Sequence, residues 1–390
     1  MNATQHDESP DRVCRIGKLE GSLKHYAWGG ATNIAALEDR RPTGQPEAER
    51  WYGTHPAGPT TLHGEDLAAA IQRHRSCALG PKTDRDSLPF LVKLLDSAQP
   101  LSLQVHPSRE EARAGFEKEV AEDTPAAIRN YRDPDPKPEV IIAITELVAV
   151  SGFKSPPQIA TVLRELCVPA LSDELAFLES AQNEEFKLQA IMKQWLSSDH
   201  RAKAEALWVA CDNFSGSSPS TTDFVAIARS INRAFPGDVG LLVALLLNTV
   251  KLLPGEALYT PANTLHAYVH GFGLEVMAPS DNVLRCAMTT KRKDIPELMR
   301  LVNFTPSQPE IFNPFRQEGY RADGFHVQMF NRSARISSIG PRIAVVTKGT
   351  VEVEGHLYEP GDAIWIPHSA GAVDVTTLNA EFALISPSGH

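Results

Sequence analysis

The chain has 390 residues, 42% of them hydrophobic, and a formal net charge of −10 at pH 7. A chain of this length can bury a large core and accommodates two or three domains. Its negative charge argues against a nucleic-acid or anionic-membrane partner, and no apolar run reaches the roughly 20 residues of a membrane helix.

The N-terminal segment and the spacing of the cysteines indicate in which cellular compartment the protein is expected. Residues 1–15 are polar and contain no apolar signal-peptide region. The cysteines lie far apart without a C-x-x-C pair, which argues against a cysteine-based zinc site and suits a reducing compartment. We therefore expect a cytoplasmic protein. The cysteines are Cys14, Cys77, Cys167, Cys211 and Cys286.

Residues 15–150 have the pattern of a β domain. Short apolar or alternating runs are separated by turns rich in Gly, Pro and Asp, which is typical of strands. Residues 108–130 differ, because Ser108 and Glu111 form a Ser-x-x-Glu capping box ahead of a helical run. We predict one helix there.

Residues 155–235 change to helical spacing. Apolar residues recur three and four positions apart, with charged residues on the other faces. A polar break at residues 215–223 predicts a loop between helices, and a short apolar helix is predicted over residues 241–247. The pattern indicates a helical domain inserted into a β domain.

Strand patterns then return twice. Residues 251–268 and 336–387 each contain a Pro-Gly turn ahead of a strand. This sequence pattern is typical of cupin jelly rolls. The predicted fold class is mainly β with an α insertion: two cupin-like jelly-roll domains plus a helical domain. The predicted domains are a discontinuous jelly roll over residues 1–154 and 236–305, a helical insertion over 155–235 and a C-terminal jelly roll over 306–390.

Four residues could bind one divalent metal ion. Gln104 and His106 stand at i and i+2, which places both side chains on one face of a strand. Glu139 has the same relation to Lys137, and flanking prolines keep the backbone extended between them. With His266, the set offers two imidazoles, a carboxylate and an amide oxygen, which suits Zn²⁺. The spacing alone also fits an ordinary pair of strand residues.

Six sequence segments, which contain or flank these four residues, together form a longer motif. They are HYAWGG (25–30), ERWYGTHP (49–56), PFLVKLLDSAQPLSLQVHPS (89–108), NYRDPDPKPEV (130–140), PGEALYTPANTLHAY (254–268) and GLEVMAPSDNVLRCAMTTKRKDIPELM (273–299). In order and approximate spacing the chain resembles the type I phosphomannose isomerases, zinc enzymes that interconvert mannose 6-phosphate and fructose 6-phosphate.

The resemblance implies roles for residues within these stretches. The implied ligands of one Zn²⁺ per chain are Gln104, His106, Glu139 and His266. The implied catalytic residues are Arg285, Lys137 and Glu275. The implied substrate-binding residues are Lys93, Ser102, Tyr268, Trp28 and Glu49. Lys137, Glu275 and a zinc-bound water all remain candidates for the group that moves the proton.

An aldose–ketose isomerisation explains why such residues would gather. A proton moves between C2 and C1 of the sugar while negative charge grows on the enediol oxygens, so a Lewis acid and a positioned acid or base are needed. The phosphate requires a fixed cation, for which Arg285, Lys93 and Lys137 are candidates.

The chain departs from the family pattern at three places. Arg50 stands where an apolar residue is common. Residues 286–288 are Cys-Ala-Met where smaller residues followed by Leu are more usual, which places larger side chains beside Arg285. Residues 133–135 are Asp-Pro-Asp, a change in a loop that leaves the ligands in place.

The sequence therefore predicts a cytoplasmic, monomeric, zinc-dependent mannose-6-phosphate isomerase with a small sugar-phosphate substrate, in which the discontinuous jelly roll is the catalytic domain. Two alternatives remain: a zinc isomerase for another sugar or sugar phosphate, and a catalytically inactive sugar-binding cupin. Loss of a ligand or of Arg285 would be typical of the inactive protein, and the sequence retains them.

Overall fold

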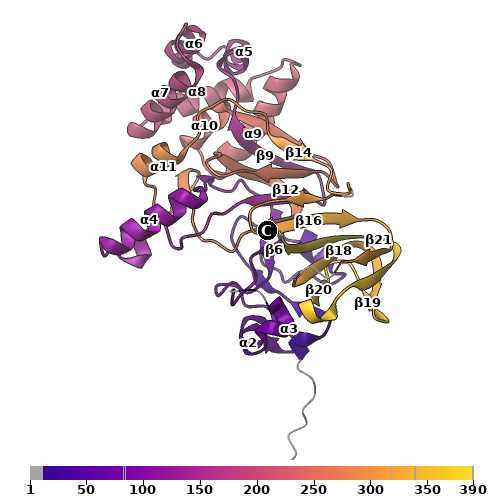
Figure 1. Cartoon of the computed structure of the whole chain (residues 1–390). Helices are drawn as coiled ribbons and strands as arrows, with labels where there is room; N and C mark the ends of the chain where they lie inside the picture. Colours follow the sequence, from indigo (N-terminus) through magenta and orange to yellow (C-terminus); the bar gives the residue numbers. More distant parts are fainter. Residues whose placement is uncertain (1–11, 82, 84, 317, 338–339, 389–390) are drawn as a thin grey trace, which may run out of the picture. The chain divides into compact units, whose positions relative to one another are not determined.

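The computed structural model describes residues 12–81, 83, 85–316, 318–337 and 340–388 (Figure 1). Residues 1–11 of the polar N-terminal segment lie outside this description. The strand pairs described are antiparallel, and the long helices concentrate between residues 156 and 246. The predicted fold class, mainly β with an α insertion, is confirmed.

The chain divides into two compact units. Unit 1 comprises Met1–Asp96, Leu274–Pro279 and Asn313–His390, and unit 2 comprises Ser97–Gly273 and Ser280–Phe312. The domain boundaries expected from the sequence stay a prediction. In the described part of the chain, no helix is long and apolar enough to cross a membrane.

Unit 1 contains a ten-stranded antiparallel sheet. Its strands are β1 (Gly17–Glu20), β4 (Thr61–Leu62), β5 (Glu65–Asp66), β15 (Tyr320–Arg321), β16 (Phe325–Phe330), β17 (Ala334–Ile336), β18 (Arg342–Val353), β19 (His356–Tyr358), β20 (Ala363–Ile366) and β21 (Val373–Pro387). The order is β15-β16-β21-β18-β20-β1-β4-β5, with β17 on β21 and β19 on β18. Alternating residues of β16 are buried, residues 382–386 of β21 are all buried, and the rings of Phe330 and Phe382 stack with centroids 5.0 Å apart.

A second ladder in unit 1 carries two predicted site residues, Glu49 and Lys93. It pairs β2 (Ser22–Lys24) with β3 (Glu49–Tyr52), and β3 with β6 (Leu91–Ser97). A Cβ on Gly30, in the HYAWGG stretch, would lie 1.9 Å from Asp96 Oδ2, and the Gly30 amide donates to the Asp96 carbonyl. The second glycine of that stretch is therefore required by close packing.

Short helices complete unit 1. They are η1 (Arg12–Cys14), α1 (Asn33–Leu37), α2 (Leu67–Arg73), α3 (Arg75–Leu79) and η4 (His368–Ala370). The sequence pattern predicts mostly strands over residues 15–150 apart from one helix, and α1, α2 and α3 correct that prediction. Asp66 caps α2 by accepting a hydrogen bond from the Ala69 amide at 2.8 Å, and an alanine-rich run follows.

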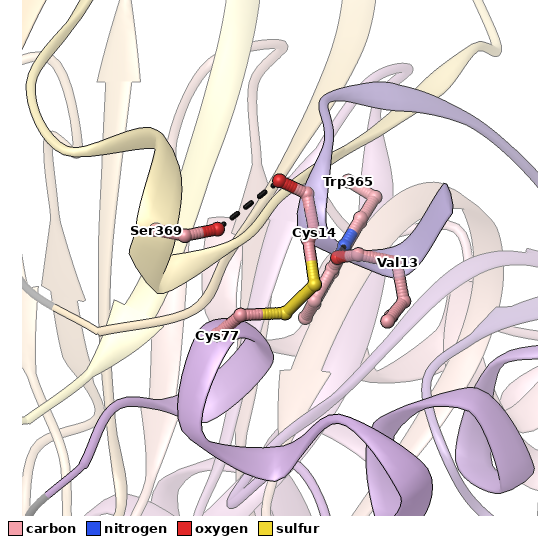
Figure 2. The surroundings of a disulfide bond; sticks show 5 residues. All are labelled: Val13, Cys14, Cys77, Trp365 and Ser369. Carbon is pink, nitrogen blue, oxygen red and sulfur yellow. Dashed lines mark hydrogen bonds between the residues drawn. A yellow bond between two sulfur atoms is a disulfide. The ribbon is translucent and has the colours of Figure 1, made fainter. Parts of the chain in front are cut away.

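A disulfide joins Cys14 to Cys77, linking η1 to α3 (Figure 2). Around it, Ser369 donates to the Cys14 carbonyl at 3.1 Å, and the Trp365 indole donates to the Val13 carbonyl at 2.8 Å. The spacing of the cysteines suits a reducing compartment. Two of them pair across a separation of 63 residues, so cysteine spacing no longer supports that inference.

Arg50, the unexplained departure in ERWYGTHP, is held by an ion-pair network. Its guanidinium contacts the Glu38 carboxylate and donates to the Gly21 carbonyl at 3.0 Å. Arg40 bridges Glu38 to the fully buried Glu47, donating to both oxygens of Glu47 at 3.0 and 2.5 Å. A basic residue at position 50 is thus matched by a local carboxylate.

Unit 2 contains the remaining strands. They are β7 (Leu103–Val105), β8 (Glu139–Ala143), β9 (Leu147–Phe153), β10 (Leu247–Leu252), β11 (Ala257–Thr260), β12 (His266–Met277), β13 (Leu284–Ala287) and β14 (Glu310–Phe312). β12 continues into unit 1 after residue 273. One ladder runs β10-β9-β12-β7-β13 and another β14-β11-β8.

The helices of unit 2 agree with the sequence pattern in large part. They are α4 (Arg109–Ala121), η2 (Ala126–Ile128), α5 (Pro156–Leu166), η3 (Pro169–Leu171), α6 (Ser172–Glu179), α7 (Glu184–Ser197), α8 (Arg201–Asp212), α9 (Pro219–Ala234), α10 (Gly240–Leu246) and α11 (Ile295–Leu301). The predicted capping box of Ser108 and Glu111 is present at α4.

Two helix boundaries differ from the prediction. α4 ends at Ala121, well before residue 130, because Asp123 adopts a positive φ of 52° and Pro125 follows. The predicted loop over residues 215–223 is shorter, since α9 begins at Pro219, a residue preorganised for the first helical position. Every residue of α10 is buried in the core that these helices share.

Candidate metal centre

Three predicted ligands meet in unit 2. His106, Glu139 and His266 are each at most 2% exposed, and one ligand atom from each lies within 4.8 Å of the others. Glu139 Oε1 lies 3.3 Å from His106 Nε2, and Glu139 Oε2 lies 3.3 Å from His266 Nε2. Two ligands about 2.0–2.1 Å from a tetrahedral zinc ion lie roughly 3.3 Å apart, so these separations fit such an ion.

The ends of three strands bring these side chains together. His106 directly follows β7 and precedes Pro107, Glu139 begins β8 after Pro138, and His266 begins β12. The prolines remove backbone donors at these ends, which stops the strands from continuing.

Backbone carbonyls orient both imidazoles. His106 Nδ1 lies 2.8 Å from the Asn282 carbonyl oxygen, and His266 Nδ1 lies 2.9 Å from that of Thr264. A carbonyl accepts only, so each Nδ1 is assigned the proton and each Nε2 keeps its lone pair. Within the described chain, His266 Nε2 and Glu139 Oε2 are buried without a hydrogen-bond partner. Two facing lone-pair atoms of this kind are suited to a shared cation.

The fourth predicted ligand lies in the same row of the ladder. Gln104 on β7 pairs directly with His266 on β12 and, on its other side, with Arg285 on β13. Directly paired residues of antiparallel strands point to one face of the sheet. The Ser102 hydroxyl lies 3.4 Å from Gln104 Oε1, and the rings of Tyr268 and His266 have centroids 6.4 Å apart.

Lys137 lies within the ligand cluster. Its ammonium contacts Glu139 Oε1 and is 3.4 Å from His106 Nε2. The side chain is 8% exposed as a residue, so its charge is poorly solvated. A cation held by Glu139 and His106 would repel this ammonium, so metal binding and the position of Lys137 are coupled.

Burial and the mutual charges set the protonation of the cluster. Burial, with a further contribution from the Lys137 charge, lowers the pKa of His106 to about 4. Burial alone would raise the pKa of Glu139, but Lys137 and the histidines outweigh it and hold that pKa well below its usual range. Burial also lowers the pKa of Arg285, and the nearby charge of Arg132 adds to this effect. At neutral pH His106 is thus a neutral imidazole and Glu139 a carboxylate, the forms that bind metal.

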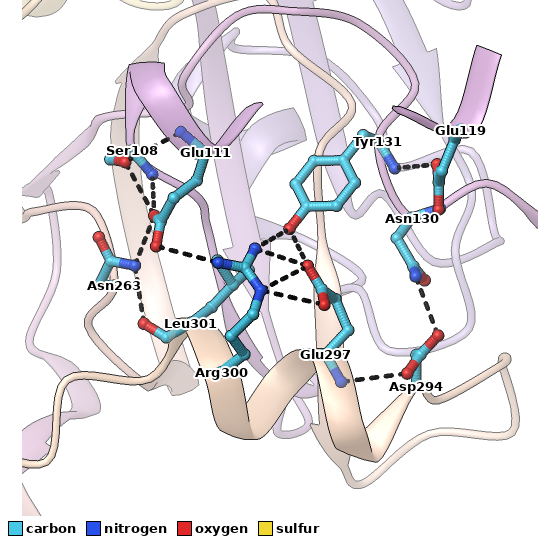
Figure 3. Close-up of polar contacts among 10 residues, drawn as sticks. All are labelled: Ser108, Glu111, Glu119, Asn130, Tyr131, Asn263, Asp294, Glu297, Arg300 and Leu301. Atoms are coloured by element: carbon cyan, nitrogen blue, oxygen red, sulfur yellow. Dashed lines mark hydrogen bonds and ion pairs between the residues drawn. The ribbon is translucent and has the colours of Figure 1, made fainter. Parts of the chain in front are cut away.

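A polar network supports the His106 strand end from α4 and α11 (Figure 3). The Asn263 amide donates to the His106 carbonyl at 2.8 Å, and the Asn263 side chain donates to Glu111 and to the Leu301 carbonyl at 2.8 and 2.7 Å. Glu111 also completes the α4 capping box with Ser108. The backbone of His106 is therefore tied to the starts of α4 and β12 and to the end of α11.

The same network holds the segment that leads to Glu139. The amides of Asn130 and Tyr131 each donate to the Glu119 carboxylate at 3.0 Å. The Tyr131 hydroxyl contacts Glu297, and Arg300 binds both groups (Figure 3). These contacts fix residues 130–131 against the two helices.

The other predicted site residues lie in unit 1. Lys93 Nζ is 3.2 Å from Glu275 Oε2 and 3.5 Å from Glu49 Oε1. Lys93 also lies over the ring of Trp51, 4.7 Å from its centroid, and the Trp51 indole donates to Glu49 at 2.8 Å. Lys93, Glu49 and Glu275 thus form one buried charged cluster.

Trp28 makes a separate aromatic contact. It is half-buried and stacks on Tyr26, with ring centroids 5.6 Å apart. The predicted roles of Lys93, Glu49, Glu275 and Trp28 in binding or catalysis stay predictions.

Sequence reasoning missed Asn282 and Trp51 as residues with many contacts. Asn282 lies in the stretch 273–299 and Trp51 in the stretch 49–56. The family resemblance therefore covered both positions, but no role was inferred for either residue. The departure at residues 286–288 is buried in the core of unit 2. These side chains, which directly follow Arg285 in the sequence, therefore act through packing in that core.

Comparison with known proteins assigns the family. A family model described as "Phosphomannose isomerase type I, catalytic domain" matches residues 16–156. A mannose-6-phosphate isomerase from Escherichia coli (strain K12) is 34% identical over 390 residues, covering 92% of this chain and 96% of that protein. The chain belongs to the type I phosphomannose isomerase family.

Two further members of the family support the assignment. A mannose-6-phosphate isomerase from Salmonella typhimurium is 40% identical over 301 residues, covering 74% of this chain and 75% of that protein. The zinc-bound crystal structure of a mannose 6-phosphate isomerase has a TM-score of 0.82 at 31% identity, covering 96% of this chain and 100% of that one. The likeness extends over both units and agrees with the cupin architecture expected from the sequence.

Proposed function

We propose that this chain is a zinc-dependent isomerase that interconverts D-mannose 6-phosphate and D-fructose 6-phosphate. Membership of the phosphomannose isomerase family supports the reaction. The observation that carries the proposal is the buried group of His106, Glu139 and His266, whose facing atoms have the 3.3 Å separations of zinc ligands.

In this proposal, one zinc ion is held by His106, Glu139 and His266, with Gln104 as the fourth ligand. The ion would supply Lewis-acid stabilisation of the negative charge that develops on the sugar oxygens. The pairing of Gln104 with His266 supports its inclusion, because both side chains project from one face of the ladder.

The proposed reaction moves a proton between C2 and C1 through an enediol, and we propose Lys137 as the group that carries it. Its amine is held beside the ligands by Glu139, and it is buried, which limits exchange with water. Proton transfer by a positioned side chain supplies about 10²–10⁴-fold in rate. Glu275 and a zinc-bound water remain the other candidates from the sequence.

Arg285 is proposed to bind negative charge on the substrate. It lies opposite Gln104, adjacent to the metal ligands in the ladder. A guanidinium offers two parallel donors to a phosphate or to a pair of sugar oxygens, and partial burial strengthens such contacts. Ser102 and Tyr268, near Gln104 and His266, are proposed as further substrate contacts.

The test is conversion of mannose 6-phosphate to fructose 6-phosphate, followed by NMR, before and after chelation and zinc re-addition. His266→Ala should bind little zinc and convert no substrate. The control is His270→Ala, because His270 is exposed four residues along the same strand. Zinc binding without conversion would refute mannose 6-phosphate as the substrate, and other sugars and sugar phosphates would then be assayed. Zinc binding without conversion of any of them would favour a sugar-binding protein.

A further inference from the structure

Both polar atoms of the Asn282 side chain are fully engaged in hydrogen bonds, although no role has been inferred for this residue so far. It is fully buried. Its Oδ1 accepts hydrogen bonds from the amides of Arg132 and Asp133 at 2.7 and 3.4 Å. Its Nδ2 donates to the carbonyls of Asp133 and Asp135 at 2.8 and 2.9 Å, and to Asp133 Oδ1 at 3.2 Å. One side chain thus binds the loop of residues 132–135 at five points.

The loop returns contacts to the segment that carries Asn282. Asp133 accepts from the Ser280 hydroxyl at 2.8 Å and from the Asp281 amide at 3.0 Å. The Ser280 hydroxyl in turn accepts from the Asn282 amide at 3.2 Å. Residues 132–135 and 280–282 therefore form one clamp, although they lie about 150 positions apart.

The clamp connects two metal ligands. On one side, the Asn282 backbone carbonyl accepts from His106 Nδ1 at 2.8 Å, which fixes the ring and directs Nε2 toward Glu139. On the other side, residues 132–135 lead directly through the Pro136–Pro138 stretch to Glu139 at the start of β8. A shift of the clamp would therefore move His106 and Glu139 relative to each other.

We propose that Asn282 is a positioning residue for the metal centre, which holds His106 and Glu139 in the mutual arrangement that binds the ion. This proposal rests on the function proposed above in one respect: it takes His106 and Glu139 as metal ligands. Partners that orient metal ligands contribute about 10–100-fold to metal affinity. Asn282 touches no substrate in this account, so it is not a catalytic residue.

The test compares zinc affinity with the stability of the metal-free protein. Asn282→Asp keeps the shape of the side chain but loses its donors and places a negative charge beside Asp133. We expect its zinc dissociation constant, from chelator competition, to rise about 10–100-fold while the metal-free variant still unfolds cooperatively. An unchanged zinc affinity in a folded variant would overturn the proposal.

The matched control is Asn248→Asp. Asn248 is also buried, and its side chain donates to three backbone carbonyls, those of Ser151, Gly152 and Ser307. We expect it to lower the melting temperature while zinc affinity stays within about twofold of wild type. Equal losses of affinity in both variants would show a general structural effect and overturn the assignment to Asn282.

Ser280→Ala supplies a milder variant if Asn282→Asp does not fold. It removes one hydroxyl from the clamp, and we expect a severalfold weaker zinc affinity with a smaller loss of stability. Wild-type zinc affinity in Ser280→Ala would then count against the proposal. Wild-type protein that binds zinc without isomerising the substrate would refute the proposed function and leave the affinity comparison valid.

Discussion

Arg285 on β13 lies directly opposite Gln104 on β7 in an antiparallel ladder. His266 on β12 lies opposite the same glutamine from the other side. A cationic side chain and two proposed metal ligands therefore share one face of three adjacent strands. This row connects the metal centre to a group that can bind substrate charge.

The first prediction concerns Arg285. Arg285→Ala should lower kcat/KM by about 100-fold or more, because a donor to developing negative charge is lost. Its zinc content should equal that of wild type, since Arg285 is not a ligand. Steady-state kinetics and metal analysis test this, with Arg113→Ala, an exposed arginine on α4, as control. Near-normal kinetics in a folded Arg285→Ala would remove this residue from the site.

The second prediction concerns the lysine among the ligands. The Lys137 ammonium contacts Glu139 and lies close to His106. Lys137→Met should therefore bind zinc about tenfold more tightly, because a neighbouring positive charge is removed. The same variant should lose isomerase activity. Chelator competition and kinetics measure both effects, and Lys118→Met on α4 is the exposed control. Weaker zinc binding would show that Lys137 supports the metal rather than opposing it.

The third prediction is a pH dependence from unit 1. The hydrogen bond from Arg40 lowers the pKa of Glu47 from 4.5 to about 2. A carboxyl group with a lowered folded-state pKa contributes stability above about pH 4.5, and this stability is lost as the pH falls toward 2. Glu47→Gln should lack this part of the acid sensitivity, about 2 kcal/mol after allowing for solvent around Arg40.

Urea unfolding at pH 6 and pH 3 measures that difference. Glu117→Gln, an exposed substitution on α4, should retain the acid sensitivity of wild type. An equal fall in unfolding free energy for Glu47→Gln and wild type would mean that the Arg40–Glu47 pair is not responsible.

The fourth prediction concerns the Cys14–Cys77 disulfide. It closes a loop across 63 positions, for which the chain-entropy model gives about 4 kcal/mol of stabilisation. The Cys14→Ser/Cys77→Ser variant should melt a few degrees below oxidised wild type, and reductant should bring wild type to the same value. Cys167→Ser removes an exposed free cysteine and should change nothing. A reductant-insensitive melting temperature would argue against the bond in solution.

The sequence was sufficient for features that depend on local spacing. The capping box at Ser108, the helical periodicity of residues 155–235 and the i, i+2 relation of Gln104 and His106 each lie within a few residues. The gathering of His106, Glu139 and His266 was anticipated through the resemblance and agrees with their geometry. Short helices such as α2 were missed because seven residues give too little periodicity to distinguish a helix.

Long-range partners were beyond sequence reasoning. The pairing of Cys14 with Cys77, the match of Arg50 to Glu38 and the contacts of Asn282 all depend on tertiary packing. One sequence contains no signal that selects these partners from many similar residues. The monomeric state and the cytoplasmic location stay predictions.

The most direct measurement is a zinc titration of the chelated protein with activity and bound metal recorded together. We expect isomerisation of mannose 6-phosphate to rise in proportion to bound zinc and to saturate at one ion per chain. Activity that is independent of bound zinc, or a fully zinc-loaded protein that leaves the substrate unchanged, would contradict the proposed metal-dependent isomerase.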